Sequence, residues 1–593
     1  MNAAQPAPFR FFLSLAVLLL ATCAPVPSPS SSASPSAQAE PEAETGHKGL
    51  QPPVTASHTM VVAAHPLAAQ AGREALRKGG SAIDAAIAAQ MVLNLVEPQS
   101  SGIGGGGFLL HYDGQSGEIS AYDGRETAPQ AATEDMFVGP AGEPVSFYDA
   151  VVGGRSVGVP GLLRMLEAAH RDHGTLAWRD LFTAAITHAE QGFAVSKRLH
   201  NLLDRDKHLP RFSQARAYFY PDGEPLKIGA IRDNPALAET FRLIAAKGTA
   251  PFYDGVIAEA IVATIRNAPI NPGLLTLDDL AGYKALERDA LCRPYRQWRV
   301  CTMPPPTSGG VTLLQALGML ETFDLASLSP DSLKTVHLLA EALKRAYADR
   351  ARYIADPDFV AIPVDGLLDP AYLLDRAREI DPSRASGKAT AGEPKSTFQL
   401  NFAPAPSTEL PSTSHISVID RHGNAVTLTS SIENAFGSRL MTSGFLLNNQ
   451  LTDFSFRPHI NGIKIANRIE PLKRPRSSMA PTLVFDENKK LVLVLGTPGG
   501  SNIIAYMLQA LVAILDQNQD IQQAVALPHH ANRNGPIQIE ADTALERLEY
   551  DLVRMDHEVV RVPMTSGLHG IAIGKDGLTG GVDPRREGMA LGD

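Results

Sequence analysis

The sequence predicts a protein of the α+β class, in which helices flank short apolar strands. Three observations support this prediction. The run 83–95 is apolar nearly all round, as expected of a buried helix. Residues 332–353 carry apolar side chains at helical spacing, with charged side chains between them. Short runs of Val, Leu and Ile between turn residues, such as 416–419 and 491–495, are typical of buried strands.

The N-terminus predicts export. Arg10 precedes an apolar stretch, 11–21, that is too short to span a bilayer comfortably. We therefore expect residues 1–23 to be a signal peptide and the mature protein to lie in the periplasm. No other apolar run in the sequence is long enough for a transmembrane helix.

The end of this leader allows two forms of processing. The run 20–23, Leu-Ala-Thr-Cys, resembles a bacterial lipoprotein cleavage box, with Cys23 as the lipidated residue. Thr22 is atypical at its position, and ordinary signal-peptidase cleavage nearby is the alternative. With a lipid on Cys23 the protein would be an outer-membrane lipoprotein. Residues 24–57 are rich in Pro, Ser and Ala, which favours a disordered tether.

The remaining elements follow in chain order. Ser81 is expected to cap the first long helix. Cys292 and Cys301 flank an expected hairpin with its turn near Arg296, and either a disulfide across it or two buried thiols fits the sequence. No cysteine–histidine spacing suggests zinc. The other predicted elements are helices at 161–170 and 502–515 and strands at 108–112, 425–429 and 482–485.

Composition bounds the function. The chain has 593 residues, 44% hydrophobic and 20% charged, which suits a large globular protein with a sizeable core. The net charge of -10 and the lack of a basic stripe give no indication of nucleic-acid binding. No linker divides the run 58–400, so we expect one large unit rather than several separate domains.

The most informative stretch is the junction at Thr413. A Pro- and Ser-rich run, 403–412, leads directly into Thr413, and a predicted strand follows. If the bond between Ser412 and Thr413 is cut, Thr413 gains a free α-amine that can act as the base for its own hydroxyl. A threonine at the end of a loop before a strand is the ordinary alternative.

Several distant segments resemble the γ-glutamyltranspeptidase (γ-glutamyltransferase) family of N-terminal nucleophile hydrolases. Each segment is weak alone, and their order and spacing together make the likeness specific over roughly residues 58–592. The segments are Val96–Pro98, Ser101–Phe108, Asp123–Pro129, Val157–Gly161, Met303–Gly310, Thr413–His415, Leu447–Gln450, Asp453–Phe454, Arg474–Met479, Gly496–Gly500 and Asp583–Arg585.

The resemblance implies a four-layer αββα sandwich made from two fragments of one precursor. A large subunit, 58–412, would pair with a small catalytic subunit, 413–593, after autocatalytic cleavage between Ser412 and Thr413. The mature enzyme would transfer the γ-glutamyl group of glutathione or a related donor to water, an amino acid or a peptide. No metal or organic cofactor is implied.

The resemblance also implies how the donor substrate is bound. Arg125 would hold the substrate α-carboxylate, for which its planar fork is suited. Asp453 would receive the α-ammonium group, assisted by Gln450. The pair Ser477 and Ser478 would hydrogen-bond the carboxylate.

Two positions depart from the family pattern. Glu433 stands where many members carry Asn; it would assist Asp453, and its extra negative charge is expected to affect the choice of acceptor. Ser431 replaces a typical threonine and is expected to hydrogen-bond Thr413.

Gly499 and Gly500 end a strand before a helix, so their N–H groups are expected to form the oxyanion hole.

Other motifs are assigned no chemical role. The run Gly102–Gly107 matches a dinucleotide-binding pattern, but it follows a helix instead of a strand, so close backbone packing is expected. His415, His529 and His530 are not needed as bases, because the Thr413 amine supplies that function. The stretch 454–476, where the family often places a lid, contains no tyrosine, and the presence of a lid is left open.

Two rival functions stay open at this point. A glutaryl-cephalosporin acylase would share the fold and the nucleophile, although Arg125 and Asp453 favour a glutamyl substrate. A catalytically inactive, lipid-anchored binding protein is the alternative from a different class. Thr413 and the pair Gly499 and Gly500 argue against it.

Overall fold

The computed structural model of the protein describes residues 1–5, 7–8, 51–405, 410 and 412–593. Residues Met1–Glu40 and residues Pro41–Asp593 form separate units, and the described residues of the first contain no helix or strand. The expected apolar core of the leader (11–21), Cys23 and the tether as far as residue 50 lie outside the described residues. Within the part of the chain that is described, no helix combines the length and apolar character that crossing a membrane requires.

The described residues of the second unit are built around two seven-stranded sheets. In the first, which we call the nucleophile sheet, all neighbouring strands are antiparallel. Its strands in spatial order are β23 (Met589–Gly592), β2 (Met60–Ala63), β10 (Ser414–Ile419), β11 (Ala425–Ser431), β3 (Gly106–Tyr112), β4 (Ile119–Asp123) and β7 (Leu286–Asp289).

The second sheet, which we call the partner sheet, is also antiparallel throughout. Its strands in spatial order are β1 (Val54–Ala56), β22 (Gly577–Val582), β21 (His569–Gly574), β17 (Leu491–Gly496), β16 (Thr482–Phe485), β9 (Trp298–Thr302) and β8 (Leu291–Tyr295). Each sheet contains strands from both sides of Thr413.

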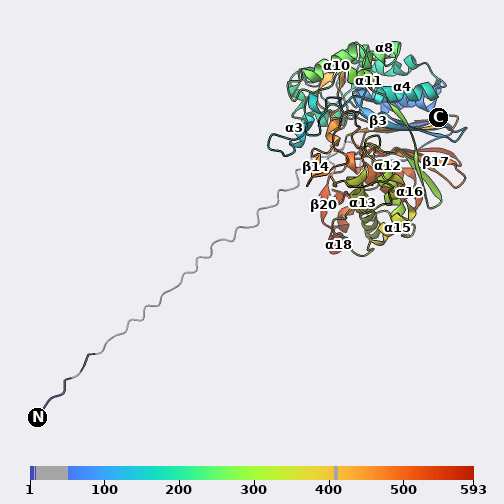
Figure 1. Cartoon of the computed structure of the whole chain (residues 1–593). Helices are drawn as coiled ribbons and strands as arrows, with labels where there is room; N and C mark the ends of the chain where they lie inside the picture. The colour runs from blue at the N-terminus through green and yellow to red at the C-terminus, as the bar shows by residue number, and fades with distance from the viewer. Residues whose placement is uncertain (6, 9–50, 406–409, 411) are drawn as a thin grey trace. The chain divides into compact units, whose positions relative to one another are not determined.

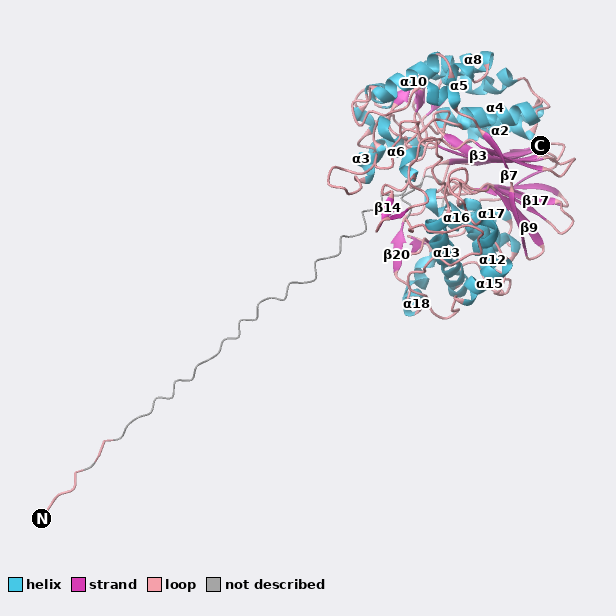
Figure 2. Ribbon diagram, viewed as in Figure 1, coloured by secondary structure: helices cyan, strands magenta, loops and turns pink. Residues whose placement is uncertain are grey.

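Helices cover the outer face of each sheet, and the two sheets face each other, which confirms the predicted four-layer αββα sandwich (Figures 1 and 2). The nucleophile sheet is covered by α1 (Pro66–Arg77), α2 (Ala82–Val96), α4 (Leu162–His173), α5 (Thr183–Gln191), α8 (Pro235–Lys247) and α10 (Val256–Arg266). The partner sheet is covered by α12 (Gly309–Leu320), α13 (Leu333–Tyr353), α15 (Pro370–Arg378), α16 (Ile503–Leu515) and α17 (Ile521–Val525).

Shorter elements complete the unit. The other helices are α3 (Phe147–Val151), α6 (Lys197–Arg205), α7 (Ser213–Phe219), α9 (Ala250–Tyr253), α11 (Leu277–Gly282), α14 (Val364–Leu367) and α18 (Glu549–Arg554). Three two-stranded sheets pair β5 (Phe193–Ala194) with β6 (Ile231–Arg232), β12 (Met441–Thr442) with β13 (Phe445–Leu446), and β14 (His459–Ile460) with β15 (Ile463–Lys464). A small sheet contains β18 (His530–Asn532), β19 (Ile537–Glu540) and β20 (Val559–Val562).

The period-2 alternation of β10 divides the core into two parts. Ile416 and Val418 point toward the helices and join the cluster that contains α2. Ile419, on the other face, joins the cluster of the partner sheet and α16. The strand that follows Thr413 is therefore buried on both sides, as its apolar sequence predicted.

The predicted elements are present, with shifted ends. Ser81 accepts a hydrogen bond from the Asp84 N–H and forms a capping box with Asp84, as expected for the start of α2. β10 begins at Ser414 instead of 416, and β11 continues to Ser431, because hydrogen bonding to neighbours extends both strands through polar residues. The expected tether, 24–57, was too long, since Val54–Ala56 pairs with β22 as an edge strand.

The cysteine hairpin also forms. Cys292 in β8 lies opposite Cys301 in β9, and the two are joined by a disulfide. Arg296 occupies the turn with a φ of 54°. Of the two alternatives that the sequence left open, the structure contains the disulfide.

Helix α13 differs from its expected character. Its pattern is amphipathic, but most of its charged side chains are buried as well as its apolar ones. Glu341, for example, accepts hydrogen bonds from Lys344 Nζ at 2.6 Å and Arg345 Nη1 at 2.9 Å. Ser386, in the segment after α15, donates a further hydrogen bond to it at 2.6 Å. The charges of α13 are therefore used internally, in ion pairs, instead of facing solvent.

Replacing Glu341 with Gln should lower the free energy of unfolding by about 3 kcal/mol at pH 7, because two buried cations lose their carboxylate. Burial alone would raise the pKa of Glu341, but its bonds to Lys344, Ser386 and Arg345 lower it to about 2. The stabilisation is therefore fully present above about pH 4.5, the usual pKa of Glu, and is lost as the pH falls toward 2.

Denaturant unfolding of wild type and Glu341→Gln at several pH values measures this difference, which should shrink below pH 4.5. Asp375→Asn is the control, because Asp375 and its partner Arg378 are exposed, and it should change stability little at any pH. A difference for Glu341→Gln that persists undiminished toward pH 2 would contradict the assignment.

Candidate active site

Thr413 lies immediately before β10, in the middle of the nucleophile sheet, and is buried. Its hydroxyl donates a hydrogen bond to Ser431 Oγ at 3.1 Å and contacts the carbonyl oxygen of Ser412, the preceding residue. Ser412 is held in turn, because its hydroxyl donates to the carbonyl of Gln99 at 2.9 Å. The peptide bond between Ser412 and Thr413 and the Thr413 hydroxyl are thus fixed against each other in the uncut chain.

Ser431 reaches Thr413 because of the register of β10 and β11. Ser414 lies opposite Ser430, so Ser431 lies beside Thr413. The N–H of Glu433 donates to Ser431 Oγ at 2.9 Å, which orients the hydroxyl. The expected contact between Ser431 and Thr413 is present.

The glycine run before β3 packs beneath this pair. A side chain at Gly105 would lie 2.1 Å from the carbonyl oxygen of Ser431, which no residue with a Cβ atom could tolerate. β3 then pairs with β11 along its whole length. This close backbone approach agrees with the packing function expected from the sequence.

The predicted site residues gather around one small cavity of about 20 Å³. They come from both sides of the Ser412–Thr413 bond and from six separate segments. The lining residues are Arg125, Leu410, Ser412, Thr413, Ser431, Glu433, Gln450, Asp453, Ser477, Ser478, Met479, Gly500 and Ile503.

Gly499 and Gly500 follow β17 and precede α16. Their φ angles are 142° and 57°, a left-handed pair that glycine adopts without strain. Gly500 lines the cavity, whereas Gly499 packs against the Tyr506 ring, which would lie 2.7 Å from a Cβ atom at this position. The turn therefore brings the expected oxyanion-hole backbone to the cavity that contains Thr413.

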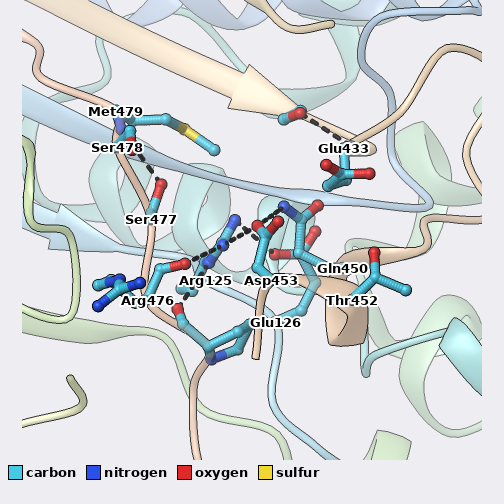
Figure 3. A network of polar contacts seen from close by, with 12 residues as sticks. Arg125, Glu126, Glu433, Gln450, Thr452, Asp453, Arg476, Ser477, Ser478 and Met479 are labelled. Carbon is cyan, nitrogen blue, oxygen red and sulfur yellow. Dashed lines mark hydrogen bonds and ion pairs between the residues drawn. The ribbon is translucent and has the colours of Figure 1, made fainter. Parts of the chain in front are cut away.

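An ion pair between Arg125 and Asp453 occupies the floor of the site (Figure 3). The guanidinium Nη2 lies 2.5 Å from Asp453 Oδ2, and both side chains are almost completely buried. Gln450 Nε2 donates to the same carboxylate oxygen at 2.8 Å. Arg125 also donates to the carbonyls of Pro475 and Arg476, at 3.1 and 2.9 Å, so its plane is fixed.

Glu126 adds a second buried carboxyl group beside this pair. Its Oε2 atom lies 3.7 Å from Arg125 Nη1. Burial raises the pKa of Glu126 to about 8, although the neighbouring guanidinium acts in the opposite direction. Glu126 is therefore protonated at neutral pH, and Asp453 is the carboxylate that forms the ion pair with Arg125.

The serine pair is supported from the rear of the site. Arg350, from α13, donates to Ser478 Oγ at 2.8 Å and to Ser308 Oγ at 2.6 Å. Ser308 then donates to the carbonyl of Ser477 at 2.6 Å. The N–H of Met479 donates to Ser477 Oγ at 3.2 Å. Both hydroxyls thus accept hydrogen bonds from the protein, which directs their own protons elsewhere.

Glu433 projects into the cavity from a strained position, with a φ of 79°. Its carboxylate accepts a hydrogen bond from the Asn449 side chain and another from the Leu410 N–H, at 3.4 Å. Leu410 itself lines the cavity. Leu410 therefore occupies space in the cavity that contains the ion pair in the uncut chain.

The histidines considered from the sequence lie outside this cavity. His415 packs between the two sheets, with its Nδ1 atom 2.9 Å from Thr429 Oγ1, and burial lowers its pKa well below the usual value. His529 lies 2.6 Å from Ser566 Oγ, and its ring packs on Tyr506. His530 is fully buried in β18, and burial lowers its pKa to about 3.

The stretch between Asp453 and Ser477 contributes no lining residue to the cavity. Its hairpin, β14–β15, lies instead against the segment before the cleavage point, where the N–H of Ala403 donates to the carbonyl of Lys464 at 2.9 Å. Phe456 packs on Phe137.

Sequence reasoning did not identify five residues that shape this site. Asn449 and Met479 lie inside quoted motifs and could have been found there, and Glu126 follows Arg125 directly. Arg350 gives no local signal, because it lies in a helix far from Ser478 in sequence. The fifth, Leu410, lies in the Pro- and Ser-rich run before the cleavage point.

Comparisons with known proteins agree with this arrangement. The family model described as Gamma-glutamyltranspeptidase matches residues 68–593. A glutathione hydrolase proenzyme of Bacillus subtilis (strain 168) is 39% identical over 546 residues, covering 90% of this chain and 91% of the relative. An acylase ACY 1 proenzyme of Pseudomonas sp. (strain V22) is 36% identical over 549 residues, covering 91% of this chain and 94% of the relative.

Among solved structures, a cephalosporin acylase from Bacillus halodurans superimposes with a TM-score of 0.79 at 26% identity, covering 92% of this chain and 97% of that one. This similarity supports the four-layer fold found here. Taken with the family model and the sequence relatives, it leads to one conclusion: the chain belongs to the gamma-glutamyltranspeptidase family.

Proposed function

We propose that this protein is a self-cleaving γ-glutamyltransferase and glutathione hydrolase whose nucleophile is Thr413. The observation that carries the proposal is the buried Arg125–Asp453 ion pair in the cavity that contains Thr413. The α-carbon of a γ-glutamyl donor carries one carboxylate and one ammonium group. These two groups can replace the internal pair, the carboxylate at Arg125 and the ammonium at Asp453, without leaving either charge unmatched.

In the first stage, Thr413 Oγ attacks the carbonyl carbon of Ser412. The carbon–nitrogen bond breaks as the oxygen–carbon ester forms, and the proton from the hydroxyl passes to the released α-amine. Water then hydrolyses the ester and leaves a large fragment ending at Ser412 and a small fragment, 413–593. Departure of Leu410 from the cavity would then open the donor site.

In the second stage, the free α-amine of Thr413 takes the hydroxyl proton while Oγ attacks the γ-carbonyl of the donor. The N–H groups of Gly499 and Gly500 stabilise the oxyanion, a contribution of about 10²–10³ in rate for one donor of this kind. The amine returns the proton to the leaving nitrogen. Water, an amino acid or a peptide amine then resolves the γ-glutamyl ester.

The balance of charges favours a glutamyl donor over a glutaryl one. Arg125 carries one positive charge, Asp453 and Glu433 carry two negative charges, and Glu126 is protonated. A glutaryl group would bring a carboxylate but no ammonium, and would leave Asp453 without a cation when it takes Arg125. The acylase function therefore fits this site less well, although acylases occur among the relatives.

We also propose export to the periplasm, with a lipid anchor at Cys23 or ordinary signal-peptidase cleavage as the two forms of processing. The leader pattern 1–23 supports this proposal. The acceptor of the γ-glutamyl group is proposed to be an amino acid or peptide that enters beside Glu433.

Replacing Thr413 with Ala should give one uncut chain without activity, because both stages use the same hydroxyl. Intact mass analysis should find two fragments for the wild type, of which the smaller begins at Thr413. For the variant it should find a single uncut chain. The mass of the large fragment also reveals whether its N-terminus is a lipidated Cys23. Two normal fragments from Thr413→Ala would refute the proposed cleavage.

Replacing Asp453 with Asn should reduce the preference for γ-glutamyl-p-nitroanilide over glutaryl-p-nitroanilide by at least ~10²-fold, because the carboxylate that faces the substrate ammonium is removed. The ratio of kcat/KM for the two substrates is the measurement. Asp206→Asn is the matched control, since Asp206 is also buried and paired with an arginine, Arg439, at 2.8 Å but does not line the cavity.

The substrate preference of Asp206→Asn should equal that of the wild type. Retention of the wild-type preference by Asp453→Asn would count against a γ-glutamyl function, and a wild type that prefers the glutaryl substrate would establish the acylase alternative.

The KM for the γ-glutamyl donor should rise above about pH 8, because Glu126 then ionises and competes with the substrate carboxylate for Arg125. The Glu126→Gln variant cannot ionise at this position, so its KM should not show the rise that Glu126 causes. At high pH its KM should be roughly tenfold lower than that of the wild type, which corresponds to a shift of one pKa unit. Steady-state kinetics of both proteins from pH 7 to 10 test it. The substrate ammonium group titrates in the same way with the wild type and with Glu126→Gln. Identical dependence of KM on pH in the two proteins would therefore exclude competition between Glu126 and the substrate for Arg125.

A further inference from the structure

The connection between the two sheets at the end of the chain carries an arginine that contacts the nucleophile. β22 belongs to the partner sheet and β23 to the nucleophile sheet, so residues 583–588 cross from one to the other. Arg586 lies in this crossing and is 3% exposed. Its Nη1 donates to the carbonyl oxygen of Thr413 at 2.8 Å.

The position of the Arg586 side chain is fixed by close packing. A Cβ atom at Gly567 would lie 2.9 Å from Arg586 Cδ and 2.7 Å from a ring carbon of Pro498, the residue before the Gly499–Gly500 turn. The arginine therefore extends past the start of the expected oxyanion hole to reach Thr413. Asp583 organises the crossing from its first residue, since its carboxylate accepts from the backbone N–H of Arg585 at 2.8 Å and of Leu568 at 3.3 Å.

The contact places a positive charge close to a group that only cleavage creates. The nitrogen and carbonyl oxygen of one residue lie about 3 Å apart, so the Thr413 amine lies within ~6 Å of Nη1. A like charge at this distance disfavours the protonated amine. A protonated amine cannot accept the hydroxyl proton, and an α-amino group ordinarily titrates close to neutral pH, near ~8.

We propose that Arg586 is a positioning residue for the nucleophile, which fixes the Thr413 carbonyl and favours the unprotonated form of the Thr413 amine in the mature enzyme. This inference rests on the proposed function and deepens it, since it concerns how the same base is kept ready. The amine accepts the proton from Oγ as the new oxygen–carbon bond forms, and later gives it to the leaving nitrogen. Arg586 exchanges no proton in either step.

Other charged groups also lie around Thr413. On the α2 side, Glu97 accepts from the Ser414 hydroxyl at 2.9 Å and is paired with Arg198 at 3.0 Å. Arg125 and Asp453 form an ion pair in the cavity. Glu433 lines the same cavity as Thr413, and its carboxylate accepts from the Asn449 side chain and the Leu410 N–H.

The charges of the crossing and the nearby imidazoles complete this environment. Asp583 is paired with Arg585 at 3.1 Å, and Arg585 is paired with Glu540 at 2.6 Å. The Glu587 carboxylate accepts from the backbone N–H of Arg198 at 3.0 Å.

Two titratable imidazole rings face the strand. One belongs to His415, which is close to Thr413 in sequence. The other belongs to His569, in β21, and stacks on the ring of His415. Burial lowers the pKa of both, that of His569 to about 4, so both are neutral when the enzyme works near pH 7. Among these groups, Arg586 is a cation that donates a hydrogen bond to Thr413 itself.

The test compares the pH dependence of kcat for hydrolysis of γ-glutamyl-p-nitroanilide in the wild type, Arg586→Gln and Arg586→Lys. Gln can still donate a hydrogen bond but has no charge, whereas Lys keeps the charge. Arg586→Gln should move the acid limb of the profile up by ~1 pH unit, and Arg586→Lys should leave it near the wild-type position. Arg376→Gln is the control, since Arg376 is also a buried, paired arginine but lies on α15, and its acid limb should not move.

Each other outcome overturns the proposal. If Arg586→Gln loses kcat equally at all pH values, or if the Lys variant shifts as far as the Gln variant, the arginine has a structural function only. If neither variant cleaves itself, Arg586 is needed for the fold or for cleavage instead of for the amine. A wild type without two fragments and without turnover refutes the proposed function itself, whereas an active wild type with an unshifted Arg586→Gln refutes only this inference.

Discussion

The antiparallel register of β10 and β11 is the constraint on which the site depends. Because Ser414 lies opposite Ser430, the hydroxyl of Ser431 lies 3.1 Å from that of Thr413. β10 is buried on both faces, so its first residue cannot move without disturbing two cores. The glycine run before β3 then brings a third backbone against Ser431. A slip of one residue would turn Thr413 away from the cavity.

In the uncut chain, the two opposite charges of the proposed donor site neutralise each other. Arg125 and Asp453 are buried at a cost that only their mutual attraction and several hydrogen bonds can offset. A ligand that supplies both an anion and a cation can enter by exchange, whereas a ligand with one charge leaves a buried ion unmatched. Under the proposed function, specificity for an amino-acid head group would follow from desolvation, and not only from the positions of hydrogen-bond donors.

The local elements and the cavity residues of the site were accessible from the sequence, but several of its supports were not. The apolar runs at α2, β10 and β16 determine their own secondary structure, and the motif residues from Arg125 to Gly500 gather as the family likeness implied. The burial of charges along α13 was missed, because amphipathic spacing does not reveal that a later loop covers the polar face.

The tether was predicted too long, since a Val-Thr-Ala strand at a sheet edge has little signal of its own. Arg350 and Arg586 act on site residues far away in sequence, and the fold alone brings them there.

The order of strands has a consequence for the two fragments. In the nucleophile sheet, β10 and β11 of the small fragment are hydrogen-bonded to β2 and β3 of the large one, and in the partner sheet β16 and β22 are bonded to β9 and β1. The pieces are interwoven, so separating them would require both sheets to be dismantled. Dilution should therefore not dissociate the two fragments. The cleaved protein would remain one particle for as long as it stays folded.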